Sequence, residues 1–178
     1  DTLALRERWP VAMSGIAWDT VSLSFGEFFS AEPEVFISRV ELAYDELQAV
    51  APGVEMTATI HVGGNEEVQV EYQGQTLSYY FLVQFADRPI TPWVHSVMYY
   101  NLYDDAGGAY GLDDFADHRD FLESKLTAGE AVGYHPETAY WVAFDNSVPT
   151  YLPVYMYSRW YDLDQLGQKG LSLRDHVI

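Results

Sequence analysis

Alternation between strand-like and helix-like segments is the feature of this sequence that most constrains its fold. Residues 54–62 alternate apolar and polar side chains, and residues 30–51 place apolar side chains at helical spacing before Pro52 and Gly53. Strands that alternate with helices form parallel sheets. The predicted order is strand 18–25, helix 30–51, strand 54–62, strand 94–100, helix 112–126, strand 131–134, a helix from 149 to Gly167, and the start of a strand in 171–178.

The segment between residues 63 and 93 interrupts this alternation. Two β-rich runs, 68–72 and 76–85, flank Gln73-Gly74-Gln75, which predicts a hairpin with Gly74 at positive φ. The alternative is that part of this segment is a loop. We therefore expect an α/β fold with a hairpin or loop insertion.

Composition restricts the class of partner. The 178 residues have the size of one domain, and we assign 1–178 to a single α/β domain. The net charge is −18 and the only lysines are Lys125 and Lys169, which argues against nucleic acid because a phosphate-binding surface needs clustered basic residues. An acidic protein also repels polyanions, which leaves a neutral, cationic or metal-bridged ligand, unless the charge serves solubility alone.

Several function classes lack their sequence signals. The chain has no cysteine, which removes disulfides, thiolate catalysis and cysteine-based zinc sites. It also lacks the glycine patterns of nucleotide-binding loops, the HExxH motif of metalloproteases and the GxSxG motif of serine hydrolases. We expect no cofactor and no metal. No apolar run is long enough to span a bilayer, so we expect no membrane insertion.

The two ends indicate a piece of a longer protein. The chain begins at Asp1 without methionine, and residues 171–178 read as the entry into a strand. We expect the remainder to lie in another segment, or an exposed sheet edge to favour self-association. We favour a secreted bacterial protein with an extracellular or periplasmic location.

Polar and aromatic side chains gather in the segment 133–149. A buried core has no use for this mixture, because each buried polar group needs a partner. A sugar-binding cleft does, since flat aromatic faces cover the apolar faces of a pyranose while carboxylates and amides bind its hydroxyls. The candidate substrate-binding residues of this segment are His135, Tyr140, Trp141, Asp145 and Asn146.

The carboxyl ends of the predicted strands supply further candidates. In alternating strand–helix folds, functional residues lie at that edge of the sheet. Glu27, His61 and Asn101 are predicted to bind substrate there. The carboxylates at the same edge are Asp104, Asp105 and Glu137.

Paired carboxylates are the groups that glycoside hydrolysis requires. One carboxylic acid protonates the leaving oxygen, and a second acts as nucleophile or as base toward water, at about 5 Å in retaining enzymes and farther away in inverting ones. The candidate catalytic pair is Glu137 with Asp104 or Asp105. The alternative is that Glu137 caps the following turn and that the two aspartates are solvated loop residues.

The histidines also carry two interpretations. His135 can orient a substrate hydroxyl or tune Glu137, but such a histidine more often bonds a backbone carbonyl. His61 has the same alternatives. His95 precedes the body of its predicted strand and is the weaker candidate.

With strands that deliver Glu27, His61, Asn101 and the turn Tyr134-His135-Pro136-Glu137 to one edge, the chain resembles part of a (β/α)8-barrel glycoside-hydrolase-like protein. The resemblance is one of layout and accounts for about half of a barrel. It implies a partial (β/α)8 (TIM-like) barrel and a carbohydrate-active enzyme that hydrolyses glycosidic bonds. The alternative is a non-catalytic carbohydrate-binding or surface-interaction domain.

Overall fold

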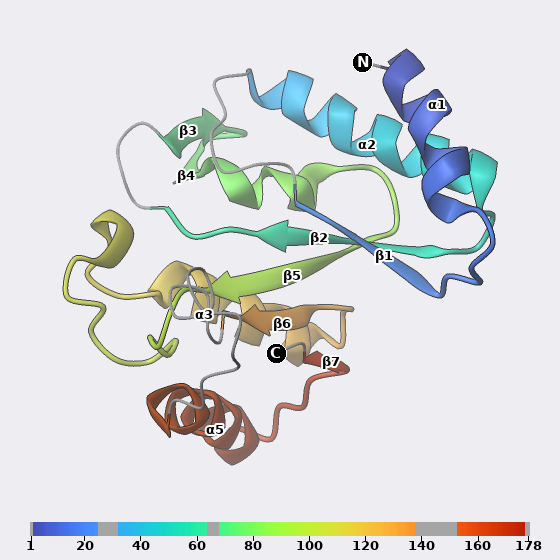
Figure 1. Ribbon diagram of the computed structural model, residues 1–178. Helices are drawn as coiled ribbons and strands as arrows, with labels where there is room; N and C mark the ends of the chain where they lie inside the picture. Colours follow the sequence, from blue (N-terminus) through green and yellow to red (C-terminus); the bar gives the residue numbers. More distant parts are fainter. Residues whose placement is uncertain (1, 25–31, 64–67, 138–152, 177–178) are drawn as a thin grey trace, which may run out of the picture. The chain divides into compact units, whose positions relative to one another are not determined.

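The computed structural model describes residues 2–24, 32–63, 68–137 and 153–176, which form two compact units (Figure 1). The first unit contains Asp1–Ile60 and Val68–Pro92, and the second contains His61–Glu67 and Trp93–Ile178. Five predicted site residues lie outside the described residues: Glu27, Tyr140, Trp141, Asp145 and Asn146.

The first unit is built from two helices and two parallel strands. Its elements are α1 (Thr2–Met13), β1 (Thr20–Leu23), α2 (Pro33–Val50) and β2 (Glu55–Ile60). Strands β1 and β2 are parallel, with Thr20 opposite Glu55. Side chains of α2, β1 and β2 share a small apolar core around Leu47 and Met56.

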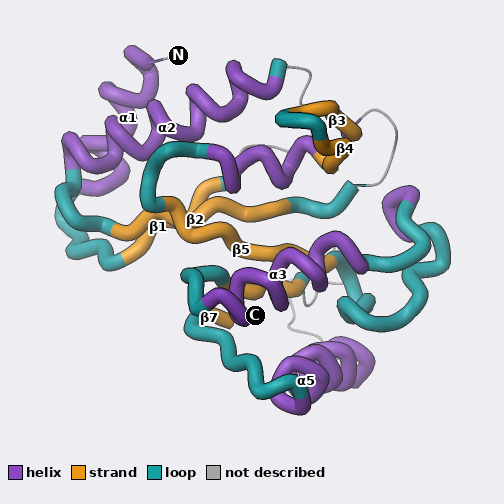
Figure 2. Tube along the Cα trace, turned by 180° about the vertical axis from the view of Figure 1, so that it is seen from behind, coloured by secondary structure: helices purple, strands orange, loops and turns teal. Residues whose placement is uncertain are grey.

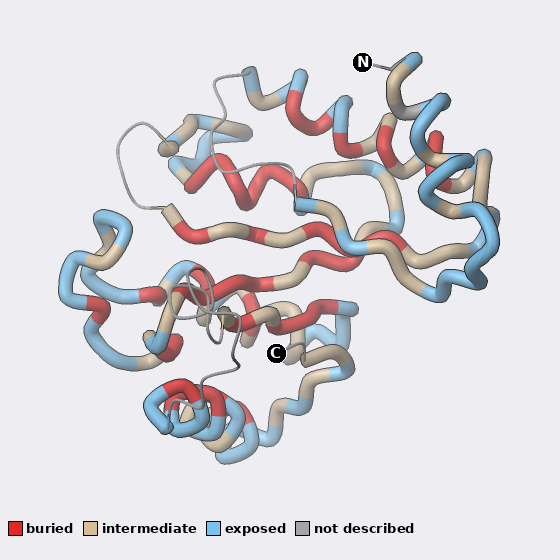
Figure 3. The backbone as a smooth tube through the Cα atoms, in the orientation of Figure 1, coloured by how far each residue is buried: buried red, intermediate tan, exposed pale blue. Residues whose placement is uncertain are grey.

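Helix α2 forms where a helix was predicted. Pro33 suits its first turn, and Glu34 lies near the positive end of the helix dipole. Its inward side is buried (Figure 3), and Gly53 follows at φ +86°. Helix α1 is not among the predicted elements, because its apolar side chains form no clear stripe and Pro10 lies inside it.

The insertion in the first unit is half hairpin and half helix. Strands β3 (Gln69–Tyr72) and β4 (Gln75–Ser78) are antiparallel, and both turn residues, Gln73 and Gly74, have positive φ. This confirms the hairpin with Gly74 at positive φ. Residues 79–85, predicted to continue the second strand, instead form the 3-10 helix η2 (Tyr79–Phe85), with Tyr79–Val83 buried.

The second unit is a parallel three-stranded arrangement with two α-helices. Its elements are β5 (Ile90–Ser96, whose first three residues belong to the first unit), η3 (Ala109–Gly111), α3 (Ala116–Ala128), β6 (Gly133–Pro136), α5 (Pro153–Gln168) and β7 (Asp175–His176). Strand β6 lies between β5 and β7 and is parallel to both. Figure 2 shows α3 in front of these strands, and Leu122 of α3 shares a core with Val94 and Tyr134.

Two details of the second unit differ from the prediction. The strand expected at 94–100 runs from Ile90 to Ser96 instead, since Pro92 is tolerated within it. Helix α5 was expected to turn Trp160 and Leu163 inward. Both are exposed, whereas Tyr155 is buried as expected.

The prediction of a partial (β/α)8 barrel is wrong. The described residues contain seven strands, of which β3 and β4 form a separate antiparallel pair, so five are parallel. The alternation of strands and helices predicted the α/β content correctly. It could not decide how many strands there are or whether they close, because the same alternation occurs in open sheets.

Most basic side chains form ion pairs inside their own unit. Three of these pairs join segments that are far apart in the sequence: Arg6 with Glu46, Arg88 with Asp45, and Lys169 with Glu123. The others are Arg119 with Asp120, Lys125 with Glu130, Arg159 with Asp162, and Arg174 with Asp175. These pairs occupy seven of the nine Lys and Arg residues of the chain.

Gly133 lies directly beneath the indole of Trp93. A Cβ atom at this position would come within 2.4 Å of Trp93 Cδ1, so Gly133→Ala should destabilise the fold by about 1 to 3 kcal/mol. Gly167→Ala is the matched control, because open space surrounds that position in α5 and alanine favours a helix by up to about 1 kcal/mol. Urea unfolding of both variants measures the difference, and equal stabilities would contradict this packing.

Candidate functional site

Three histidines and a tryptophan form one row of rings in the second unit. His95 of β5 and His135 of β6 are register partners, with ring centroids 5.6 Å apart. His61, which directly follows β2, has its ring centroid 4.7 Å from that of His95, and the Trp93 ring lies 6.0 Å from His135. We call His61, Trp93, His95 and His135 the histidine row.

The period of two in β5 explains why these rings meet. Successive side chains of a strand point to opposite faces, so Trp93 and His95 share one face while Val94 and Ser96 share the other. Val94 is fully buried in the core beneath α3 and α5. The histidine row therefore occupies the sheet face opposite the helices of its unit.

The ring nitrogens of the row differ in their partners. Nδ1 of His61 donates to the carbonyl oxygen of Val62 at 2.9 Å, which places a proton on Nδ1. The His61 carbonyl in turn accepts a hydrogen bond from Nε2 of His118, a buried histidine of α3, at 3.0 Å. Nδ1 of His95 and Nδ1 of His135 have no partner among the described residues. Both nitrogens are buried, so each is a polar atom without a partner in the described part of the unit.

Burial keeps the inner rings of the row neutral. His95 is only 7% exposed, and burial, reinforced by the neighbouring rings of His61 and His135, lowers its pKa well below the usual value for histidine. Burial also lowers the pKa of His135, which is half-buried. A neutral imidazole has one donor and one acceptor nitrogen, so these rings suit an uncharged ligand with hydroxyl groups.

Glu137 supports the turn that follows β5. Its backbone N–H donates to Ser96 O at 2.9 Å, and its Oε2 accepts the N–H of Met98 at 2.7 Å. Met98 has φ +50°, a strained conformation for a residue other than glycine. Glu137 therefore caps the turn after β5, whereas the alternative interpretation named the turn that follows Glu137, which lies outside the described residues.

Asn101 and Asp104 belong to one capped loop. The Asn101 side-chain oxygen accepts the N–H groups of Tyr103 and Asp104, and its Nδ2 donates to Asp104 Oδ2. Asp105 accepts the N–H of Gly107 in the following turn. Such bonds are typical of loop-forming Asn and Asp residues. The loop thus gives all three side chains a structural task.

A buried polar cluster lies on the other face of the same strands. The guanidinium of Arg159 donates to Ser96 Oγ and Tyr134 Oη, both at 2.8 Å, and to the carbonyls of Met98 and Tyr100. Tyr134 also donates to Asp162, whose other oxygen accepts the N–H of Leu102. This cluster ties α5 to β6 and to the loop after β5.

The predicted site residues that the structure describes lie in two groups with different roles. His61 and His135 meet through His95, which the predicted strand boundary had made the weaker candidate. Asn101 and Asp104 meet in the loop after β5, while Glu137 is engaged with Met98. The register of β5 against β6 places His95 beside His135, and no sequence motif encodes that register.

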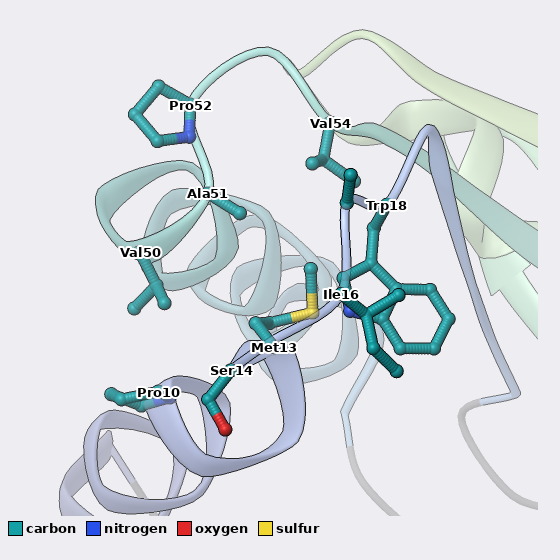
Figure 4. Close-up of a pocket in the computed structure, with 10 residues that line it drawn as sticks. Pro10, Met13, Ser14, Ile16, Trp18, Val50, Ala51, Pro52 and Val54 are labelled. Carbon is teal, nitrogen blue, oxygen red and sulfur yellow. The ribbon is translucent and has the colours of Figure 1, made fainter.

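Two pockets lie away from the row. A pocket of about 420 Å³ in the first unit is lined by Ser14 and otherwise by apolar residues, including Met13, Ile16 and Trp18 (Figure 4). A pocket of about 340 Å³ in the second unit is lined by Asp113, Asp114, Asp117 and His118, among others. His118, which lines this second pocket, also donates from Nε2 to the His61 carbonyl.

Among the described residues, no group of three or more acidic or histidine side chains could hold a metal ion. No helix in the described ranges is long and apolar enough to cross a membrane. No family model matches the chain, and neither a curated protein nor a solved structure is similar to it.

Asp162 gives the second unit a distinctive pH response. Burial raises its pKa from 3.8 to about 6, against the opposing hydrogen bond from Tyr134. The folded state therefore binds a proton that the unfolded state releases between about pH 4 and pH 6, so this group's contribution to stability falls as the pH rises. Relative to Asp162→Asn, the wild type should lose about 1 to 3 kcal/mol between pH 4 and pH 7. Urea unfolding across that range measures it, and parallel pH profiles would contradict the assignment.

The depressed pKa of His95 predicts the opposite slope. Below pH 6.5 the unfolded chain takes up a proton that the folded His95 refuses, so stability is lost as the pH falls. His95→Phe keeps a ring in place and should remove about 1 kcal/mol of this loss per pH unit below pH 6. Unfolding curves at pH 5 to 7, with NMR titration of the His95 ring, measure it. A ring that titrates near pH 6.5 would refute the prediction.

Proposed function

We propose that the second unit binds a neutral carbohydrate at the histidine row. The observation that carries the proposal is the contact of three imidazoles and an indole on one sheet face, where the buried Nδ1 atoms of His95 and His135 lack a partner among the described residues. Aromatic faces pack against the C–H faces of a sugar ring, and neutral ring nitrogens bond its hydroxyls.

Charge supports a neutral ligand over an ionic one. The net charge of −18 disfavours phosphate, sulfate and carboxylate ligands. The lowered pKa values of His95 and His135 keep these rings from attracting an anion. A polyhydroxyl compound needs donors and acceptors without net charge, which is what the row offers.

Hydrolysis of a glycosidic bond by Glu137 with Asp104 or Asp105 stays a prediction. The hydrogen bonds of these carboxylates to Met98, Asn101 and Gly107 favour a structural task for each. Binding without cleavage is therefore the function that we favour, and cleavage is an outcome that the following experiment can return.

Titration calorimetry with soluble gluco-, xylo-, manno- and chito-oligosaccharides tests the proposal. We expect at least one of these to bind, and His135→Phe to weaken its binding about three- to tenfold through loss of one hydrogen bond. His176→Phe is the matched control, because His176 stacks on Tyr134 on the other sheet face. Equal affinity of the wild type and His135→Phe, or no binding at all, would refute the site.

Release of reducing sugar from the same compounds separates binding from hydrolysis. The proposal predicts none. If the wild type releases sugar and Glu137→Gln abolishes the release while binding persists, binding without cleavage is wrong and the paired-carboxylate prediction is right.

A further inference from the structure

Helix α5 exposes an apolar stripe on its outer side. Its inner side buries Tyr155, Ser158, Arg159, Asp162 and Leu166. The stripe recurs at helical spacing and consists of Met156 (56% exposed), Tyr157 (57%), Trp160 (59%) and Leu163 (40%). Side chains of this size and exposure, gathered on one helix, mark a surface that has a binding role.

The rings of this stripe form one connected group with Tyr161. The ring centroid of Tyr157 lies 6.1 Å from that of Trp160 and 6.0 Å from that of Tyr161, and the two tyrosine planes differ by only 13°. Tyr161 is held from below by an edge contact with Tyr103. Rings that brace one another lose little conformational freedom when a ligand covers them.

The chemistry around the rings identifies the occupant. Asp104 lies close enough to Tyr161 to be the main cause of that phenol's raised pKa, and Asp164 lies on the same helix beside the stripe. The one basic residue of α5, Arg159, is buried in the polar cluster. The nearby Lys169 is paired with Glu123. The carboxylates beside the stripe therefore repel an acidic ligand, and they repel the same face of a second copy of the chain.

We propose that the outer face of α5 is a platform for a neutral polysaccharide, separate from the histidine row. Tyr157 and Trp160 cover the apolar faces of consecutive sugar rings, and Asp164 and the phenol of Tyr161 bond their hydroxyls. Tyrosine and tryptophan suit this role because each joins a flat apolar body to a polar tip. Because these rings are exposed along one helix, the platform suits an extended or insoluble chain.

Pull-down on microcrystalline cellulose, chitin and insoluble mannan tests the platform, with polygalacturonate as the acidic comparison. The wild type should bind at least one neutral polysaccharide and not the acidic one. Tyr157→Ala with Trp160→Ala should weaken binding about ten- to a hundredfold, since each lost ring contact contributes up to about one order of magnitude. Exposed positions tolerate such changes, and thermal unfolding checks this.

Met156→Ala with Leu163→Ala is the matched control in the same stripe. A sugar platform depends on the rings, so this aliphatic double variant should bind as the wild type does. His135→Phe should also bind normally here, which separates failure of the platform from failure of the row.

Three results would overturn the platform. They are absence of binding to every neutral polysaccharide, equal losses in the aromatic and aliphatic variants, and a dimer in sedimentation that Trp160→Ala converts to a monomer. The last result would assign the stripe to a second copy.

Discussion

The guanidinium of Arg159 is the group on which the second unit depends. It is 3% exposed and donates to the Ser96 and Tyr134 hydroxyls and to the Met98 and Tyr100 carbonyls. One side chain of α5 thereby fixes the end of β5, the middle of β6 and the strained turn at Met98. Its loss would leave Asp162 buried without its cation, which typically costs about 3 to 5 kcal/mol.

In the second unit, the side chains that pack the core and those of the histidine row lie on opposite faces of the strands. Val94, Ser96 and Tyr134 point into the helical core and the polar cluster, while Trp93, His95 and His135 point the other way. A ligand at the row therefore meets rings whose backbone is already held from behind. Preorganisation of this kind reduces the entropy lost on binding.

How far the sequence predicted this structure depended on whether the signal was local. Pro52 and Gly53 end α2, and Gly74 makes its turn, because each acts on its own backbone. Residues 79–85 are apolar throughout, so no periodicity could separate a buried 3-10 helix from a strand.

Local sequence signals could not predict contacts between residues that are far apart in the sequence. Trp160 points outward because of how α5 packs. His61 contacts His95, and His95 contacts His135, because of strand register, which no single segment encodes. The sequence suggested that Glu137 caps the turn following it, not the turn at Met98. Its partner, the N–H of Met98, lies on another strand's end and could not be identified from the sequence.

The chain has 27 Asp and Glu residues but only nine Lys and Arg residues, and ion pairs among the described residues already engage seven of those nine, so most carboxylates have no cation to neutralise them. Mutual repulsion among them destabilises the compact state, and dissolved ions screen that repulsion between charges more than about 10 Å apart at 0.1 M. Salt should therefore raise the folding stability of this protein, whereas it lowers the stability of a protein whose surface charges form attractive pairs.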